Sequence, residues 1–565
     1  GPQAFHDFNR STDPIPEPTP ERMNDILAII ANTFNIKPYR PLHFVDAQAA
    51  MTPLSTSASY YDKFDITTVY LAHHSSPQRY AHRVTSKGHY NNVMLNTFRR
   101  DLHFVKLDGH PFETFLNGIR LPDNEIRAKL IMYFLDHPTQ LFIRSQISLR
   151  DPNEPKKIRP VYSVDSRFLH VEKMLTTNFL VQMRNPQCCV LHGLETFRGA
   201  MSIIDRIAHS FNFYVSLDWS QFDQRLPLTV VRAYYTRFLP SLLIISDGYF
   251  PSRGYMVNTQ STDSFAIKIH RLLNFLYSWY INMVFLSYDG YAYSRLHGGV
   301  PSGLLNTQSL DSFGNMFILA DCLLEFGFTI DETKDMIFFI LGDDNIFFGR
   351  QDFDRIVRFM TFLDSYARKR HGMVLSVLKS LFTTLRTKIE ILGYTNNYGM
   401  PTRPLGKLVA QLAFPERPIA DNKLWMHAAR ALGLSYAACG QDWQFHLLCK
   451  MVYDKFKPTH AVPSTLLQKV MKFNVREIFD VDIDSSELFV FPEFPTLHQI
   501  RSLVSNYHGP FSETDKWPES LFTTPPSDNL HEFLTLDEWL QSHPEVSFTD
   551  EKFMPGYDTP EVLSA

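Results

Sequence analysis

The chain has 565 residues, of which 44% are hydrophobic and 20% are charged, a composition and length that suit a large folded enzyme of several lobes. No uninterrupted apolar run reaches the roughly 18 residues of a membrane span, and the N-terminal residues show no basic-then-apolar leader. The 5 cysteines include no CxxC pair, which argues against a disulfide scaffold and against a Cys/His metal site.

Charge is unevenly distributed along the chain. Residues 477–565 contain 18 acidic and 3 basic side chains, a net charge of −15. Residues 1–476 contain 52 basic and 41 acidic side chains, a net charge of +11. The basic body suggests a polyanion as partner, whereas the acidic segment either competes with that partner or only keeps the protein soluble.

Hydrophobic periodicity and turn residues predict the main elements. In chain order these are a Pro-rich lead-in over 10–20, a helix over about 22–33, a buried strand over 211–219, an apolar helix or paired strands over 271–286, a Gly-rich turn over 298–303, a helix ending near Phe326 before Gly327, a hairpin over 336–348 and a helical region over about 405–475. After residue 476 the periodicity fades, which predicts an irregular segment. Its apolar stretches, 489–494 and 534–540, predict that parts of it dock on the body.

Acidic residues stand at the ends of two predicted strands. Asp218 ends the strand in SLDWSQFDQRLP, Asp223 follows beyond a turn, and Asp343 and Asp344 occupy the hairpin turn in LGDDN. If these segments pair, the carboxylates face one another and repel unless divalent cations neutralise them. Oxygen ligands select Mg²⁺ or Mn²⁺, and two such ions form a clamp for phosphoryl transfer. The alternative is two unrelated Asp-rich turns.

The stretch GGVPSGLLNTQSLDSFGN (298–315) combines a glycine-rich loop with a polar helix face. Its candidate residues are two in the loop and three that recur at every fourth position: Ser302, Gly303, Thr307, Asp311 and Asn315. Beside Asp223, such a polar stripe could hydrogen-bond a ribose 2′-hydroxyl. The alternative is a solvated helix face with capping residues.

A basic cluster precedes both segments, in RDPNEPKKIRPVYSVD (150–165). Its Lys156, Lys157 and Arg159 carry cations at a density that suits a triphosphate. The alternative is a solvated loop.

In this order and spacing, the stretches resemble motifs F, A, B and C of viral RNA-dependent RNA polymerases, and more narrowly the polymerases of partitiviruses and their picobirnavirus-like relatives. The strings VYSVD, GLETFRG and ILGYTNNYGMP extend the resemblance over about 140–405. The resemblance implies an α+β fold, a closed right hand of fingers, palm and thumb with an antiparallel palm sheet. The fingers and thumb are then largely helical, and the acidic C-terminal segment is irregular.

The domain boundaries implied by the resemblance are an N-terminal extension (1–60), fingers (61–210), palm with motif A (211–227), a fingers insertion (228–288), palm with motifs B to E (289–404), thumb (405–476) and the acidic C-terminal segment (477–565). We expect the acidic segment to pack near the RNA exit or central channel, where its removal would raise RNA affinity. If the segment is structural instead, its removal would destabilise the protein.

The resemblance also implies a function. The chain would replicate and transcribe a viral double-stranded RNA genome by transferring nucleotides to an RNA 3′-hydroxyl with two Mg²⁺ or Mn²⁺ ions. The implied partners are template and product RNA, nucleoside triphosphates and viral capsid protein, with no membrane. The implied location is the virion interior and the host cytoplasm. Rival readings are a reverse transcriptase and a catalytically silent protein that binds RNA or anchors to the capsid.

Residue roles carry over by position in the motifs. Asp218 and Asp343 resemble the main metal ligands, Asp344 a supporting ligand or a contact near the primer end, and Asp223 the ribose reader. Ser302, Gly303 and Thr307 match the residues that position template and nucleotide. Lys156, Lys157 and Arg159 match those at the nucleotide entry, and Lys379 matches the lysine that protonates the departing pyrophosphate.

Two positions depart from the commonest pattern of the family. Asp311 stands where polymerases of plus-strand RNA viruses usually have asparagine, and Asn315 lies one helical turn further on. Either residue could complete sugar selection. The role of Asn345, directly after the carboxylate pair, is open.

Overall fold

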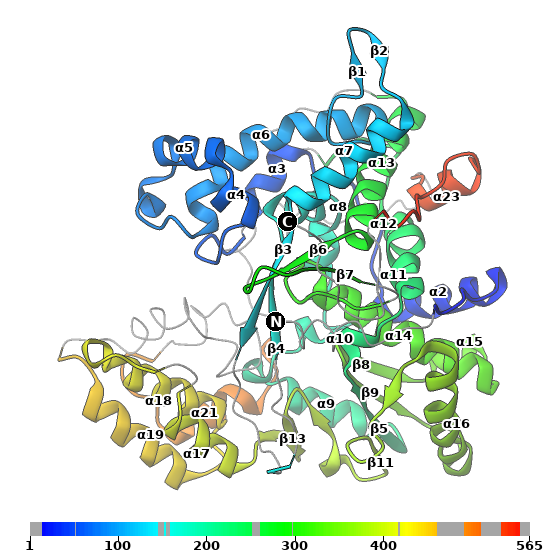
Figure 1. Ribbon diagram of the computed structural model, residues 1–565. Coiled ribbons are helices and arrows are strands. Elements are labelled where there is room, and N and C mark those ends of the chain that lie inside the picture. The colour runs from blue at the N-terminus through cyan, green and yellow to red at the C-terminus, as the bar shows by residue number, and fades with distance from the viewer. Residues whose placement is uncertain are drawn as a thin grey trace.

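Figure 1 shows the chain as a computed structural model, which describes residues 14–50, 52–144, 152–153, 159–250, 260–295, 298–415, 418–459, 491–509 and 533–553. In this view a large, mostly helical lobe lies above a five-stranded sheet and a smaller helical lobe, which stand side by side. No described helix combines the length and the apolar character that a membrane crossing needs.

The five-stranded sheet carries both Asp-bearing segments. Its order is β10–β5–β9–β8, β11 also pairs with β5, and every pair is antiparallel. The strands are β5 (Phe213–Ser220), β8 (Ile337–Leu341), β9 (Asp344–Gly349), β10 (Val374–Leu375) and β11 (Leu381–Thr383). The buried strand predicted over 211–219 and the hairpin predicted over 336–348 are confirmed.

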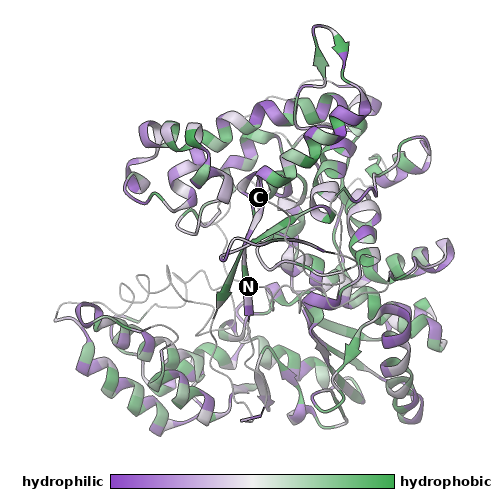
Figure 2. Ribbon diagram, viewed as in Figure 1, coloured by the Kyte–Doolittle hydropathy of each residue, from purple (hydrophilic) through white to green (hydrophobic). Residues whose placement is uncertain are grey.

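Strand β5 alternates in burial with a period of two. Leu217 and Trp219 are buried, whereas Ser216, Asp218 and Ser220 are half-buried. The buried face packs on the helices behind the sheet, α14 (Thr307–Phe326) and α16 (Phe353–His371). In Figure 2 the strands of this sheet are mainly hydrophobic, whereas the outer helices carry both hydrophobic and hydrophilic residues. Asp218 therefore lies on the face of the sheet opposite α14 and α16.

Helix α14 is buried on all sides over most of its length, from Ser309 to Leu323. It ends at Gly327, which adopts a left-handed conformation with φ of 115°, as the sequence predicts. The alternative of a solvated helix face was wrong. Neighbouring elements also cover the polar positions Asp311 and Asn315, which are therefore buried.

The large lobe contains a second, mixed sheet of order β4–β3–β6–β7, in which only β3 and β6 are parallel. For the run 271–286 the sequence predicted an apolar helix or paired strands. The structure has the end of a helix and then a strand there, so each alternative is correct for part of the run. The strands are β3 (Thr139–Arg144), β4 (Arg159–Ser163), β6 (Val284–Ser287) and β7 (Ala292–Ser294). The helices are α3 (Phe44–Ala49), α4 (Tyr60–Phe64), α5 (Ile66–Ser75), η1 (Gln78–Tyr80), α6 (Lys87–Asp108), α7 (Asp123–Asp136), α8 (Ser166–Gln182) and α13 (Thr262–Ile281).

Short elements connect the lobes. They are η2 (Leu191–Gly193), η3 (Thr196–Arg198), α9 (Ala200–Ala208), α10 (Phe222–Arg225), α11 (Leu228–Ala233), η4 (Tyr234–Phe238), α12 (Leu239–Leu242), α15 (Ile330–Lys334) and η5 (Arg386–Lys388). A small ribbon of β1 (Phe115–Leu116) and β2 (Ile119–Arg120) projects from the top of the molecule in Figure 1.

The smaller lobe has its own hydrophobic core. Its elements are β12 (Glu390–Ile391), β13 (Tyr394–Asn397), β14 (Met400–Thr402), α17 (Leu405–Ala413), η6 (Asp421–Lys423), α18 (Trp425–Ala437), α19 (Trp443–Phe456) and α21 (Leu497–Ser505). The predicted helical region is thus confirmed from Leu405 to Phe456, and the part from 460 to 475 lies outside the described residues.

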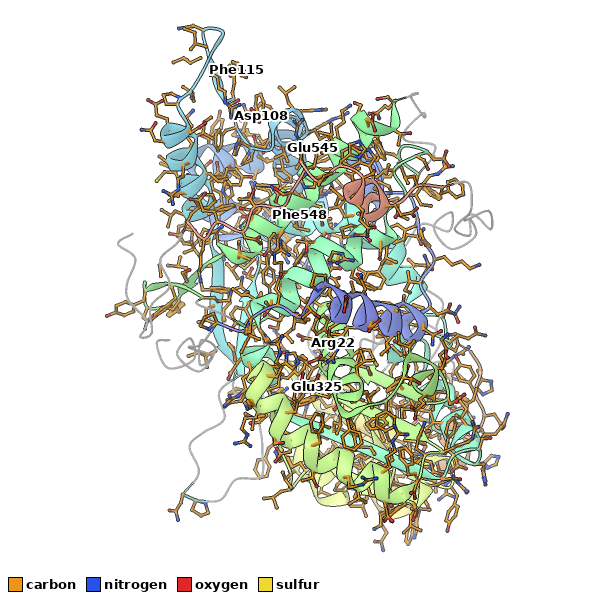
Figure 3. The ribbon with its side chains drawn as sticks, turned by 90° about the vertical axis from the view of Figure 1, so that its right-hand side faces the viewer. Arg22, Asp108, Phe115, Glu325, Glu545 and Phe548 are labelled. Carbon is orange, nitrogen blue, oxygen red and sulfur yellow. The ribbon has the colours of Figure 1, made fainter. Side chains whose placement is uncertain are left out.

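The predicted N-terminal helix is confirmed as α2 (Pro20–Phe34), which packs against α14 and α15. Its Arg22 donates from two guanidinium nitrogens to Asp321 and to Glu325, both at 2.8 Å. Figure 3 shows Arg22 on this helix above Glu325. These two bonds fasten α2 to α14.

The described parts of the acidic segment dock on the body, as the apolar stretches predict. Helix α23 (Leu536–Gln541) packs against α12 and α13 and buries Leu536 and Trp539. Phe548, labelled in Figure 3, packs against the ring of His270 at 4.6 Å between centroids. Acidic side chains here pair with arginines of the body, as in Arg232–Asp550 at 2.9 Å. These contacts favour the structural role of the segment over competition with RNA.

Replacing Trp539 with alanine should lower the free energy of unfolding by about 3–5 kcal/mol, because a buried indole is removed. The indole Nε1 also donates to Asp263 at 2.8 Å, and that bond is lost. Chemical denaturation measures the change. The exposed Glu545 of the same segment gives the control, Glu545→Ala, which should leave the midpoint unchanged. A wild-type midpoint for Trp539→Ala would contradict a structural role.

Candidate active site

The two Asp-bearing segments lie side by side, as the sequence predicts. In the antiparallel pairing of β5 with β9, Asp344 is the direct partner of Asp218. Directly opposed residues of an antiparallel pair point to the same face of the sheet. Gly342 and Asp343 form the turn between β8 and β9. Asp218 is half-buried, and Asp343 and Asp344 are exposed.

The charges of the site act strongly on Asp343. Partial desolvation by the surrounding protein atoms, and then the negative charges of Asp223 and Asp218, raise the pKa of Asp343 to about 6. The positive charge of Arg159 opposes this rise. Asp343 and Asp223 are both exposed to solvent. The fold therefore brings residues of three predicted motifs close enough for their charges to act on one another.

Asp223 and Asp311 are joined by a hydrogen bond between their carboxyl groups. Asp311 is only 4% exposed. Its burial and the charge of Asp223 raise the pKa of Asp311 well above its usual range, and burial also raises the pKa of Asp223. Burial disfavours the charged form more strongly at Asp311, which is the less exposed of the two, so we expect a proton shared by the pair to reside on Asp311. Like an asparagine amide, a neutral carboxylic acid can both donate and accept a hydrogen bond.

The side-chain amide of Asn315 makes its hydrogen bonds to other residues of the protein. Its amide nitrogen donates to the carbonyl oxygen of Gly342 at 3.0 Å. Its oxygen accepts from Nε1 of Trp219 at 3.1 Å and from Nδ2 of Asn345 at 2.8 Å. Ser312, one turn earlier, accepts from the amide of Gly342 at 3.0 Å. Asn315, Ser312 and Asn345 thus fix the aspartate turn from behind. Sequence reasoning missed Ser312, although its spacing of three from Asn315 puts both on one helix face.

The glycine-rich loop before α14 is fastened to the segment after β5. The amide of Val300 donates to the carbonyl of Asp223 at 2.7 Å, and the amide of Gly299 donates to that of Leu226 at 2.9 Å. Gly303 has no room for a side chain, because a Cβ would lie 2.3 Å from the carbonyl oxygen of Tyr162. Ser302 beside it is exposed.

Thr307 stabilises this loop from inside. Its hydroxyl donates to the carbonyl of Pro301 at 2.9 Å and accepts from the amide of Leu304 at 3.1 Å. Glu172 of α8 fastens the end of the loop, because its two carboxyl oxygens accept from the amides of Leu305 at 2.9 Å and Asn306 at 3.1 Å. Burial raises the pKa of Glu172 to about 8, and these two amides oppose the rise. No local pattern identifies Glu172, which lies more than a hundred residues before the loop.

Lys379 lies in the turn between β10 and β11, and its side chain is exposed. This turn is attached to the backbone of Asp218 on both sides. The amide of Ser376 donates to the carbonyl of Asp218 at 2.8 Å, and the amide of Asp218 donates to the hydroxyl of Ser380 at 3.1 Å. The predicted Lys379 therefore lies on a segment bound to the predicted metal ligand.

Of the predicted basic cluster, the structure places Arg159. It is exposed at the start of β4, and its charge lowers the pKa values of Asp343 and Asp223. Lys156 and Lys157 lie outside the described residues.

The chemistry of the donors suits a hard divalent cation. Asp218, Asp343 and Asp344 offer carboxylate oxygens on one sheet edge, and the crowding of negative charge that raises the pKa of Asp343 is relieved by a counter-charge. Among the described residues, no three His, Cys, Asp or Glu side chains are already arranged around an ion. The carboxylate oxygens are therefore the type of ligand that the predicted ions prefer. The carboxylates are not as closely grouped as the ligands of a preformed metal site.

Comparisons with known proteins agree with the sequence motifs. Residues 146–387 match the family described as viral RNA-dependent RNA polymerase. The RNA-directed RNA polymerase of Atkinsonella hypoxylon virus is 37% identical over 546 residues, which cover 92% of this chain and 80% of that protein. The RNA-directed RNA polymerase of White clover cryptic virus 1 is 25% identical over 410 residues, which cover 69% of this chain and 62% of that protein.

Solved structures show the same fold at low sequence identity. A sicinivirus RNA-dependent RNA polymerase matches with a TM-score of 0.51 and 14% identity, over 83% of this chain and 89% of that one. The RNA-dependent RNA polymerase of a human picobirnavirus matches with a TM-score of 0.51 and 14% identity, over 85% of this chain and 80% of that one. The chain belongs to the viral RNA-directed RNA polymerases and has their right-hand fold.

Proposed function

We propose that this polymerase extends RNA by two-metal nucleotidyl transfer, with Asp218 and Asp343 as the main ligands of two Mg²⁺ or Mn²⁺ ions and Asp344 in support. The observation that carries the proposal is the pairing of β5 with β9, which brings these carboxylates to one edge of the sheet. When bound, the ions would activate the RNA 3′-hydroxyl and stabilise the leaving oxygens.

Ribose selection belongs to Asp223 and Asp311 in this proposal. Asp311 donates its proton to Asp223 and so fixes the exposed carboxylate, which then accepts a hydrogen bond from the 2′-hydroxyl of the incoming nucleotide. Asn315 is not required for sugar contact, because its amide group already bonds Gly342, Trp219 and Asn345.

The remaining residues position the substrates. The loop of Ser302 and Gly303, braced by Thr307, supports the template and the nucleotide. Arg159, whose charge acts on the aspartates, contacts the entering triphosphate together with Lys156 and Lys157. Lys379 protonates the departing pyrophosphate, and the attachment of its turn to Asp218 supports this role.

Similarity to the polymerase of Atkinsonella hypoxylon virus supports the broader proposals. The enzyme replicates and transcribes a double-stranded RNA genome, contacts viral capsid protein, and acts in the virion interior and the host cytoplasm. The division into fingers (61–210 and 228–288), palm (211–227 and 289–404) and thumb (405–476) follows the same resemblance.

Extension of a short RNA primer on an RNA template tests the proposal. With Mg²⁺ and ribonucleotides we expect longer strands. A chelator should abolish extension while a gel-shift assay still shows RNA binding, and added Mn²⁺ should restore it. Preference for deoxyribonucleotides would indicate a reverse transcriptase, and RNA binding without any extension would indicate a silent RNA-binding protein. Extension that persists in chelator would contradict the metal mechanism.

A further inference from the structure

A cavity of about 120 Å³ lies between α3, α6 and α8, on the side of the large lobe. Polar groups from three separate segments line it, including Thr52, Lys87, Ser166, His170 and Lys173. No aspartate or glutamate is among its lining residues. The mechanism proposed above uses none of these side chains.

Two cations face this cavity without a carboxylate partner. Among the described residues, the ammonium of Lys87 has no ion pair and no side-chain hydrogen bond, and that of Lys173 donates only to the hydroxyl of Thr52, at 2.8 Å. Burial lowers the pKa of each lysine to about 8, and the charge of Lys87 lowers that of Lys173 further. The carboxylate of Asp165 pairs with Arg167 at 3.1 Å and acts on Lys87 only through its charge, which opposes the lowering of the pKa of Lys87.

His170 adds an unpartnered polar atom to the same cavity. Its side chain is 1% exposed, and its Nε2 has no hydrogen-bond partner among the described residues. Burial, and then the charge of Lys173, lower the pKa of His170 to about 3, so the ring is neutral. The cavity is thus lined by two ammonium groups without an ion pair and by one unpartnered ring nitrogen, and no carboxylate lines it.

We propose that this cavity binds a phosphate group, held by the ammonium groups of Lys87 and Lys173 with the hydroxyls of Thr52 and Ser166 beside them. Lysine is a point-charge donor to phosphate, and the cavity volume is of the size of one such group. Its source is either a phosphodiester of bound RNA or a free phosphate or nucleotide.

The position of the cavity gives this binding a consequence for the polymerase. Lys173 directly follows Glu172, the residue that fastens the glycine-rich loop. A phosphate on Lys173 therefore restrains α8 at the point where this helix holds the loop that positions template and nucleotide.

Thermal unfolding in inorganic phosphate, against chloride of equal ionic strength, tests the site without requiring polymerase activity. Phosphate should raise the Tm of the wild-type chain by about 2 °C or more. Lys173→Met and Lys87→Met should lose this shift. In chloride, Lys173→Met should unfold at the same or a higher temperature, because it removes a buried unpaired charge. The matched control is Lys334→Met, on a lysine 54% exposed in α15, which should keep the shift.

Binding of single-stranded RNA over a range of salt concentrations identifies the source of the phosphate. If RNA supplies it, each cavity variant should flatten the slope of log K against log salt by about 0.7. An unchanged slope together with a lost phosphate shift would assign the site to a free phosphate or nucleotide. Two results would overturn the proposal, both with an RNA slope that the cavity variants leave unchanged. In the first, the variants still show the phosphate-induced rise in Tm; in the second, the wild type shows no such rise.

Discussion

Asparagine in place of Asp343 should reduce nucleotide incorporation by about 10²–10³-fold or more, because the reacting phosphate loses a preorganised charge at its metal site. RNA binding should stay largely unchanged, since it depends on the basic surface and not on this turn. Folding should not suffer, because Asp343 is exposed and its carboxylate is repelled by those of Asp223 and Asp218.

Single-turnover incorporation at saturating Mg²⁺ measures this effect, with a gel shift for RNA and a melting curve for folding. Asp335→Asn is the matched control, because Asp335 is an exposed aspartate at the end of α15, just before β8. It should incorporate nucleotides like the wild type. Incorporation near the wild-type rate by Asp343→Asn would rule Asp343 out as a metal ligand.

Leucine in place of Asp311 should lower the preference for ribonucleotides over deoxyribonucleotides by about 10²-fold, because Asp223 loses the proton donor that fixes it. Asp311→Asn should keep most of the preference. An amide donates a hydrogen bond as the protonated carboxyl group does, and it fits the same buried space. The ratio of kcat/KM for the two nucleotide types measures the effect.

Asn315→Leu separates ribose selection from support of the aspartate turn. It removes the hydrogen bonds to Gly342, Trp219 and Asn345, so incorporation of both nucleotide types should fall together. If Asp311→Asn loses the discrimination between ribonucleotides and deoxyribonucleotides as fully as Asp311→Leu, Asp311 acts as a charged group. The assignment of a shared proton to Asp311 is then wrong. If Asn315→Leu alone changes the sugar ratio, Asn315 is the ribose reader.

The sequence predicted those parts of the site that depend on local pattern. The alternation along β5 and the Gly-Asp-Asp turn define two strands, and an antiparallel pairing of them places Asp218 opposite Asp344. Gly327 marks the end of α14 because its conformation is left-handed, at φ 115°. Such features require only the residues of the element itself.

Contacts between distant segments could not be predicted in this way. Glu172 reaches the glycine-rich loop, and Ser376 and Ser380 bond the backbone of Asp218, only after segments far apart in the sequence have come together. The choice between Asp311 and Asn315 also depended on packing. One turn of helix separates them, yet Asp311 bonds Asp223 while Asn315 bonds the turn behind it.

The most direct test of the metal assignment is anomalous diffraction from a crystal soaked with Mn²⁺ and a nucleoside triphosphate. We expect manganese peaks bound by carboxylate oxygens of Asp218 and Asp343, at the edge where β5 meets β9. Manganese bound elsewhere, with both carboxylates free of metal while the nucleotide is in place, would contradict the assignment.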